Sequence, residues 1–256
     1  MLTIILLSLV ACISAVIDTI AGGGGLLTVP AMLLTGMPPL SALATNKFQA
    51  TFGAGTATWQ FARQGVYHWS SVIGGVLWCL FGAVIGTLLI ESIQPGVIQY
   101  LIPLLLLGIW ITLVFAPKLG NLPGKKRCRT SVFFCVFGLL LGAYDGFLGP
   151  GTGSFWVFAM IALLGWQFIQ ATMHTKLYNF VSNFGSLLVF MVGGFVRYDL
   201  GIAMAVGQML GAYMGSHLVI TRGQYLIRPL LLFMTGTMII VLVFTNITSV
   251  HHNHTL

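Results

Sequence analysis

The chain has 256 residues, of which 57% are hydrophobic and only 6% are charged, and its mean hydropathy is +0.99. Soluble domains carry about a quarter charged residues, so this chain cannot cover a water-facing surface. Its apolar runs reach the roughly 20 residues that a transmembrane helix needs, without the period of two that marks barrel strands. The composition therefore excludes a soluble domain and predicts an all-α polytopic membrane protein.

The formal net charge of +7 would suggest a nucleic-acid partner in a soluble protein. Here the basic residues lie mostly in loops, where positive charge orients a membrane protein. Residues 118–130 (KLGNLPGKKRCRT) form the only sizeable polar loop and are predicted to be cytoplasmic. The expected surroundings are a lipid bilayer, with no nucleic-acid partner.

Cysteine, histidine and glycine patterns give no sign of enzymatic chemistry. The four cysteines show no C-x-x-C pairing, and the chain lacks H-E-x-x-H, G-x-S-x-G and the phosphate-binding G-x-x-x-x-G-K-[ST]. We therefore predict no catalytic residue, no metal and no cofactor. Energy for any transport must come from a gradient or from a partner.

The first predicted helix covers residues 2–21 and leads, through Asp18, into four consecutive glycines, Gly22 to Gly25. Each glycine costs a helix about 1 kcal/mol, so the helix should break there. Residues 26–37 are apolar but too short for an ordinary span, and prolines punctuate them. A re-entrant or tilted half-helix fits this segment, because irregular backbone at membrane depth is tolerated where it lines a cavity.

Three longer helices are predicted next, near 41–64, 70–93 and 95–117. The first carries a polar stripe at steps of three or four residues, which should point into the bundle. This stripe consists of Asn46, Gln49, Gly53, Thr56 and Gln60. In the second helix, Gly82 and Gly86 have the spacing that allows close helix contact.

After the basic loop, the order of motifs seen in the first half is repeated. The same shift in residue number aligns Lys47 with Lys176 and Gly82 with Gly211. A second glycine-rich break, Asp145 to Gly153, matches the first one. We predict two homologous repeats, with about eight transmembrane helices and two short broken or re-entrant segments. The divisions are a first membrane repeat (1–117), the basic cytoplasmic loop (118–130), a second membrane repeat (131–247) and a polar tail (248–256).

The relative orientation of the repeats stays open at this point. If the short segments near 26–37 and 153–165 do not cross the membrane, the repeats are parallel; if they cross, the repeats are inverted. The distribution of charge leans towards inversion, and the helix lengths lean the other way. The ridge Gly207, Gly211 and Gly215 is expected to pack within the bundle, while packing between subunits of a homo-oligomer stays an alternative.

The recurring polar groups predict an anion site where the broken helices meet. Helix N-termini after the glycine runs would direct free backbone N–H groups and a positive dipole end at that point, and one lysine from each repeat would add charge. The predicted substrate-binding residues are Gly22, Gly23, Gly24, Gly25, Asn46, Lys47, Gln49, Gly149, Gly151, Thr175, Lys176 and Asn179. Asp18 and Asp145 are expected to pair with the lysines or, alternatively, to carry protons in coupled transport.

The blocks Ile20 to Leu26, Pro30-Ala31 and Ala44 to Gln49 resemble the signature of the sulfite exporter TauE/SafE family, also called the 4-toluene sulfonate uptake permease family. The resemblance covers essentially the whole chain. It implies a multi-pass transporter of small anions, often sulfur-containing, in the bacterial inner membrane. The second-half block departs from the first, since Pro150 interrupts its glycines and His174-Thr175 replaces Thr45-Asn46.

The sequence therefore predicts a secondary transporter that exports a small anion such as sulfite or an organosulfonate. Two alternatives remain, a passive anion channel and a membrane scaffold that transports nothing. The substrate, the direction, the coupling ion and the oligomeric state are not determined by the sequence.

Overall fold

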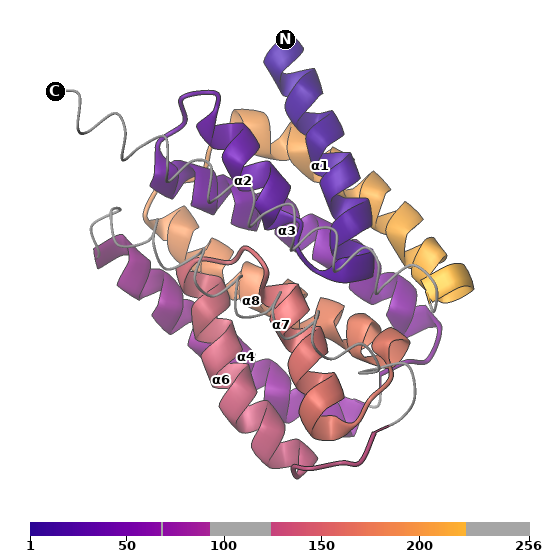
Figure 1. The fold of residues 1–256 in the computed structure, drawn as a ribbon. Helices are drawn as coiled ribbons and strands as arrows, with labels where there is room; N and C mark the ends of the chain where they lie inside the picture. Colours follow the sequence, from indigo (N-terminus) through magenta and orange to yellow (C-terminus); the bar gives the residue numbers. More distant parts are fainter. Residues whose placement is uncertain (68, 93–123, 224–256) are drawn as a thin grey trace, which may run out of the picture.

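The computed structural model describes residues 1–67, 69–92 and 124–223 of the chain (Figure 1). The predicted span at 95–117, the first part of the basic loop (118–123), the end of the second repeat and the polar tail lie outside the described residues. All regular elements in the described part are helices. The predicted all-helical class is thus confirmed there.

The first half contains α1 (Leu2–Ala21), α2 (Gly25–Leu33), α3 (Pro39–Arg63) and α4 (Trp69–Ser92). The second half contains α6 (Thr130–Phe147), α7 (Thr152–Ala159), a π-helical turn η1 (Met160–Leu164), α8 (Phe168–Val192) and the helix Tyr198–Gly223. By length and composition, four of the described helices can cross a membrane: Leu2–Ala21, Val72–Ser92, Thr130–Phe147 and Tyr198–Gly223. The helices α3 and α8 are long as well, but they carry buried polar residues.

The predicted helix break is present. Gly22 ends α1 with a left-handed backbone (φ 70°), a conformation that glycine adopts without steric cost. α2 then has 9 residues and is about 13 Å long, too short to cross a hydrocarbon core of about 30 Å. α7 has 8 residues and continues directly into η1 as far as Leu164, so both halves contain a short helix that follows a glycine-rich break.

Glycine ridges bring the two halves into close contact. Gly82 and Gly86 of α4 lie against the backbone of α6, and Gly142 of α6 lies against Cys79 of α4. The ridge Gly207, Gly211 and Gly215 packs within the chain, against the backbone and side chains of α1. Small residues thus let α4 approach α6 and let α1 approach the helix Tyr198–Gly223 (Figure 1).

The central helices α3 and α8 pack against each other and run in opposite directions (Figure 1). The backbone N–H of Arg197, just after α8, donates to Thr45 near the start of α3. The Tyr67 hydroxyl, just after α3, donates to the carbonyl of Met173 near the start of α8. The shift in residue number that aligns Lys47 with Lys176 also aligns the first and last residues of α3 with those of α8. These two corresponding helices are therefore antiparallel.

The polar stripe of α3 points inwards only in its first half. Asn46, Gln49 and Gly53 are buried as predicted, but Thr56 and Gln60 are only half-buried. The α-helical period of 3.6 residues gradually rotates positions that lie three and four apart around the helix. The prediction was therefore wrong for the last two members of the stripe.

Candidate functional site

The two helix breaks meet in direct backbone contact at the centre of the bundle. A side chain at Gly22 would lie 2.6 Å from the carbonyl carbon of Gly153, and one at Gly153 would lie 2.6 Å from the Cα of Gly22. The hydroxyl of Ser154 donates to the carbonyls of Ala21 and Gly22 and joins the two breaks. Only glycine fits on both sides of this crossing.

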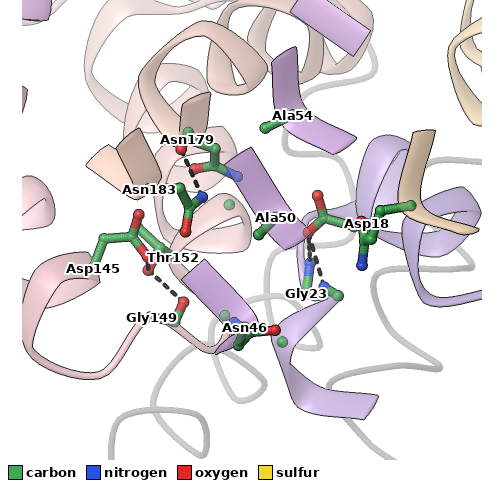
Figure 2. Close-up of a pocket in the computed structure, with 15 residues that line it drawn as sticks. Asp18, Gly23, Asn46, Ala50, Ala54, Asp145, Gly149, Thr152, Asn179 and Asn183 are labelled. Carbon is green, nitrogen blue, oxygen red and sulfur yellow. Dashed lines mark hydrogen bonds between the residues drawn. The ribbon is translucent and has the colours of Figure 1, made fainter. Parts of the chain in front are cut away.

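A cavity lies beside the crossing (Figure 2). The space open to the centre of a water molecule is about 30 Å³, more than the roughly 10–15 Å³ that one water needs. Its lining is mostly backbone and polar side chains, and comes from α1, α3, α6, α8, the helix Tyr198–Gly223, both breaks and the first residues of α2 and α7. The lining residues are Asp18, Gly23, Gly24, Gly25, Asn46, Ala50, Ala54, Asp145, Gly149, Gly151, Thr152, Gly153, Asn179, Asn183 and Gln208.

Lys47 of α3 pairs with Asp145 of α6, with 2.8 Å between Nζ and Oδ1. The two side chains are 2% and 4% exposed. The carboxylate also accepts hydrogen bonds from the hydroxyls of Thr152 and Ser182. This pair is therefore almost completely buried, although Asp145 lines the cavity, and its carboxylate has the additional hydrogen bonds that a buried ion pair requires.

Lys176 of α8 pairs with Asp18 of α1, again with 2.8 Å between Nζ and Oδ2. The other carboxylate oxygen of Asp18 accepts the backbone N–H groups of Gly23 and Gly24, each at 2.8 Å. The Lys176 side chain is 1% exposed, but the Asp18 side chain is 24% exposed. This second pair differs from the first because its carboxylate is more open to the cavity.

Each ion pair joins a lysine of one half to an aspartate of the other half. The sequence left pairing and proton carriage open for Asp18 and Asp145, and the structure contains both pairs. Both lysine charges are therefore compensated by carboxylates of the protein. Likewise, the N–H groups of Gly23 and Gly24 already donate to a carboxylate of the protein.

Side-chain amides supply most of the uncharged polar lining. The Asn46 oxygen accepts hydrogen bonds from Thr28 and Gln49. Asn179 is 6% exposed, and its Oδ1 has no hydrogen-bond partner among the described residues. The amide of Asn183 donates to the backbone carbonyl of Asn179 (Figure 2). The cavity wall thus contains a buried amide oxygen that the described part of the protein does not satisfy.

Nine of the fourteen predicted binding and coupling residues line the cavity. They are Asp18, Gly23, Gly24, Gly25, Asn46, Asp145, Gly149, Gly151 and Asn179. Five do not belong to its lining: Gly22, Lys47, Gln49, Thr175 and Lys176. Lys47, Gln49 and Lys176 each bond to a lining residue, whereas Thr175 donates to the carbonyl of Ala171 within its own helix.

Sequence reasoning missed Ala50, Ala54, Thr152, Gly153, Asn183 and Gln208. The constant offset between the repeats could have found some of them, because it pairs Ala50 with Asn179 and Ala54 with Asn183. All four line the cavity. Gln208 carried no such signal. It lies against Gly53, where a side chain would come within 2.5 Å of the Gln208 Oε1.

Comparison with known proteins identifies relatives over almost the entire chain. The profile of the family described as Sulfite exporter TauE/SafE matches residues 7–251. A probable membrane transporter protein of Haemophilus influenzae is 42% identical over 236 residues, covering 91% of this chain and 92% of the relative. The probable membrane transporter protein YfcA of Escherichia coli K12 is 42% identical over 229 residues, covering 90% and 85%. YdhB, a probable membrane transporter protein of Bacillus subtilis, is 24% identical over 201 residues, covering 77% and 81%. No solved structure matches the chain significantly.

Proposed function

This chain belongs to the sulfite exporter TauE/SafE family, and we propose that it is a secondary transporter that exports a small anion, such as sulfite or an organosulfonate, across the bacterial inner membrane. The names of its relatives support the general class, since three bacterial relatives are called probable membrane transporter proteins. Several apolar helices support a multi-pass protein in a lipid bilayer.

The observation that carries this proposal is the polar cavity beside the crossing of two helix breaks. Secondary transporters commonly bind their substrates where discontinuous helices meet. The cavity is lined by backbone, amides and carboxylates in a chain that is otherwise strongly apolar. Polar groups inside a membrane protein are costly and usually mark a substrate or ion pathway.

The arrangement of the halves supports alternating access. We propose that the chain consists of two inverted repeats, because α3 and α8 correspond end to end in the sequence and yet are antiparallel. The short lengths of α2 and α7 taken alone favour parallel repeats, but the opposite directions of α3 and α8 outweigh them. Parallel repeats would require α3 and α8 to run in the same direction. In inverted repeats, rocking of one half against the other exposes a fixed central site to each side in turn.

The proposal is tested with purified protein in liposomes loaded with labelled sulfite, with and without a proton gradient. We expect efflux that the gradient stimulates. Asn179→Ala should lower this efflux about tenfold or more, because it removes an amide that can hydrogen-bond a charged substrate, a contact of about 1.5–3 kcal/mol. The Asn179 Oδ1 accepts no hydrogen bond from the described residues, so its removal breaks none there.

Gln60→Ala serves as the matched control, because it removes an amide of α3 that does not line the cavity. It should retain wild-type efflux. Absence of sulfite efflux from the wild-type protein would reject sulfite as the substrate. Conductive flux that no gradient stimulates would instead identify a passive anion channel.

A further inference from the structure

Asp18 occupies a cradle with the composition of an oxyanion site. Two consecutive backbone N–H groups, of Gly23 and Gly24, converge on one carboxylate oxygen, and the ammonium group of Lys176 contacts the other. Successive N–H groups that follow a left-handed residue form a concave site that binds anions, and Gly22 is that left-handed residue. The N-terminus of the 9-residue helix α2 adds its dipole to the same place.

The group bound in this cradle is the Asp18 carboxylate, and part of it is accessible from the cavity. Both carboxylates line the cavity, but the Asp18 side chain is 24% exposed, whereas the corresponding Asp145 side chain is 4% exposed. Asp145 is further held by the hydroxyls of Thr152 and Ser182. Asp18 has no such side-chain hydroxyl donor among the described residues and can therefore be replaced from the cavity at lower cost.

The cavity also contains an independent sign of a missing ligand. Asn179 lies in its wall, is only 6% exposed, and its Oδ1 has no partner among the described residues (Figure 2). A buried polar atom without a partner costs about 1–3 kcal/mol, so such atoms usually mark a place for water, an ion or a substrate. An amide can meet a ligand with its oxygen or, after rotation, with its NH₂ group.

We infer that Asp18 is an internal substitute for the transported anion: its carboxylate fills the oxyanion position of the empty carrier, and the substrate takes that position when Asp18 moves out. This inference rests on the proposed function and specifies how its site works. A singly charged oxyanion, such as a sulfonate or hydrogen sulfite, has the charge and the oxygen atoms to replace a carboxylate. Lys176 keeps one counter-charge in both states, so its ammonium group is never left uncompensated in the interior.

This competition has a measurable consequence for affinity and for turnover. In a variant that lacks the Asp18 carboxylate, Lys176 has no counter-charge from that position. An external anion can then bind without first displacing Asp18. Binding should become tighter. Release should become slower, because no internal anion is available to take the place of the departing substrate.

The test measures sulfite binding to the purified full chain in detergent, and sulfite efflux from liposomes. Asp18→Asn keeps the shape of the side chain and removes its charge. We expect its Kd for sulfite to fall about tenfold or more, a change of about 1.4 kcal/mol, and its maximal efflux and KM to fall together. Ser14→Ala is the matched control. It removes a hydrogen bond to the carbonyl of Gly24 in the same segment but keeps the carboxylate, so it should bind sulfite no more tightly than the wild type.

A second variant, Asp18→Ala, allows chemical rescue with formate, the smallest carboxylate. Formate should raise the thermal unfolding midpoint of Asp18→Ala by clearly more than that of the wild type. The inference is overturned if the wild type binds sulfite and both Asp18 variants bind it no more tightly, with no additional stabilisation by formate. If no protein binds or transports sulfite while formate rescues Asp18→Ala, the cradle is an anion site and the proposed function is wrong for sulfite.

Discussion

At the scale of single residues, the two ion pairs have the same composition and different surroundings. Lys47 and Asp145 lie within the protein, and two hydroxyls complete the shell of the carboxylate. Asp18 and Asp145 both line the cavity, but Asp18 has the larger exposed fraction and accepts two backbone N–H groups. We therefore propose that the first pair chiefly stabilises the fold and that the second acts in the site.

This assignment predicts different stability effects at Asp145 for a single and a double substitution. Asp145→Asn leaves the Lys47 ammonium buried without a counter-charge, which typically costs about 3–5 kcal/mol. Asp145→Asn combined with Lys47→Met removes both charges and should regain most of that loss, because a buried pair itself contributes little net stability. Thermal unfolding of the purified proteins in detergent measures both effects. Equal destabilisation by the single and the double variant would show that the uncompensated charge of Lys47 is not the cause of the loss in stability.

At the scale of elements, the sequence predicts most helices well because glycine and proline positions determine their ends. The predicted helices 2–21, 41–64 and 70–93 are observed at Leu2–Ala21, Pro39–Arg63 and Trp69–Ser92. The half-helix predicted at 26–37 is observed at Gly25–Leu33. Sequence reasoning could not give the partners of the lysines, because each lies in the other half. Choosing them requires the direction in which the halves pack.

The crossing of the two breaks leads to a prediction about glycine. A methyl group at Gly153 would lie 2.6 Å from the Cα of Gly22 and 3.0 Å from the amide nitrogen of Asn179. Backbone must shift to accept it, so Gly153→Ala should destabilise the protein by about 1–3 kcal/mol. Gly74→Ala is the matched control, since nothing lies within 4 Å of a side chain at that position of α4. The thermal unfolding midpoint should fall for Gly153→Ala only. A loss of the same size in both variants would mean that the crossing is not tightly packed.

At the scale of the whole molecule, the two halves are interlocked. α1 packs against the helix Tyr198–Gly223 of the second half, and α4 of the first half packs against α6. Both ion pairs cross between the halves in the same manner. Glycine ridges, lysine–aspartate pairs and helix breaks thus occur twice, once in each half, as the proposed inverted repeat requires. A movement of one half must therefore act on the central cavity, to which both halves contribute.

Inverted repeats predict that α1 and α6 begin on opposite sides of the membrane. The helix Tyr198–Gly223 runs parallel to α1, and α4 runs parallel to α6. A cysteine introduced by Thr3→Cys, just inside α1, should then react with a membrane-impermeant maleimide from one side only. The native Cys128, just before α6, should react from the other side. The basic loop around Cys128 is expected on the cytoplasmic face because positive charge is retained there.

The two labelling sites are compared in backgrounds that leave one cysteine each. Cys12, Cys79 and Cys135 are replaced in both proteins, and Cys128 is replaced as well in the Thr3→Cys protein. Right-side-out cells and inverted vesicles present the two faces of the membrane to the reagent. Labelling of both sites from the same face would reject the inverted arrangement, and with it the alternating-access argument that depends on it.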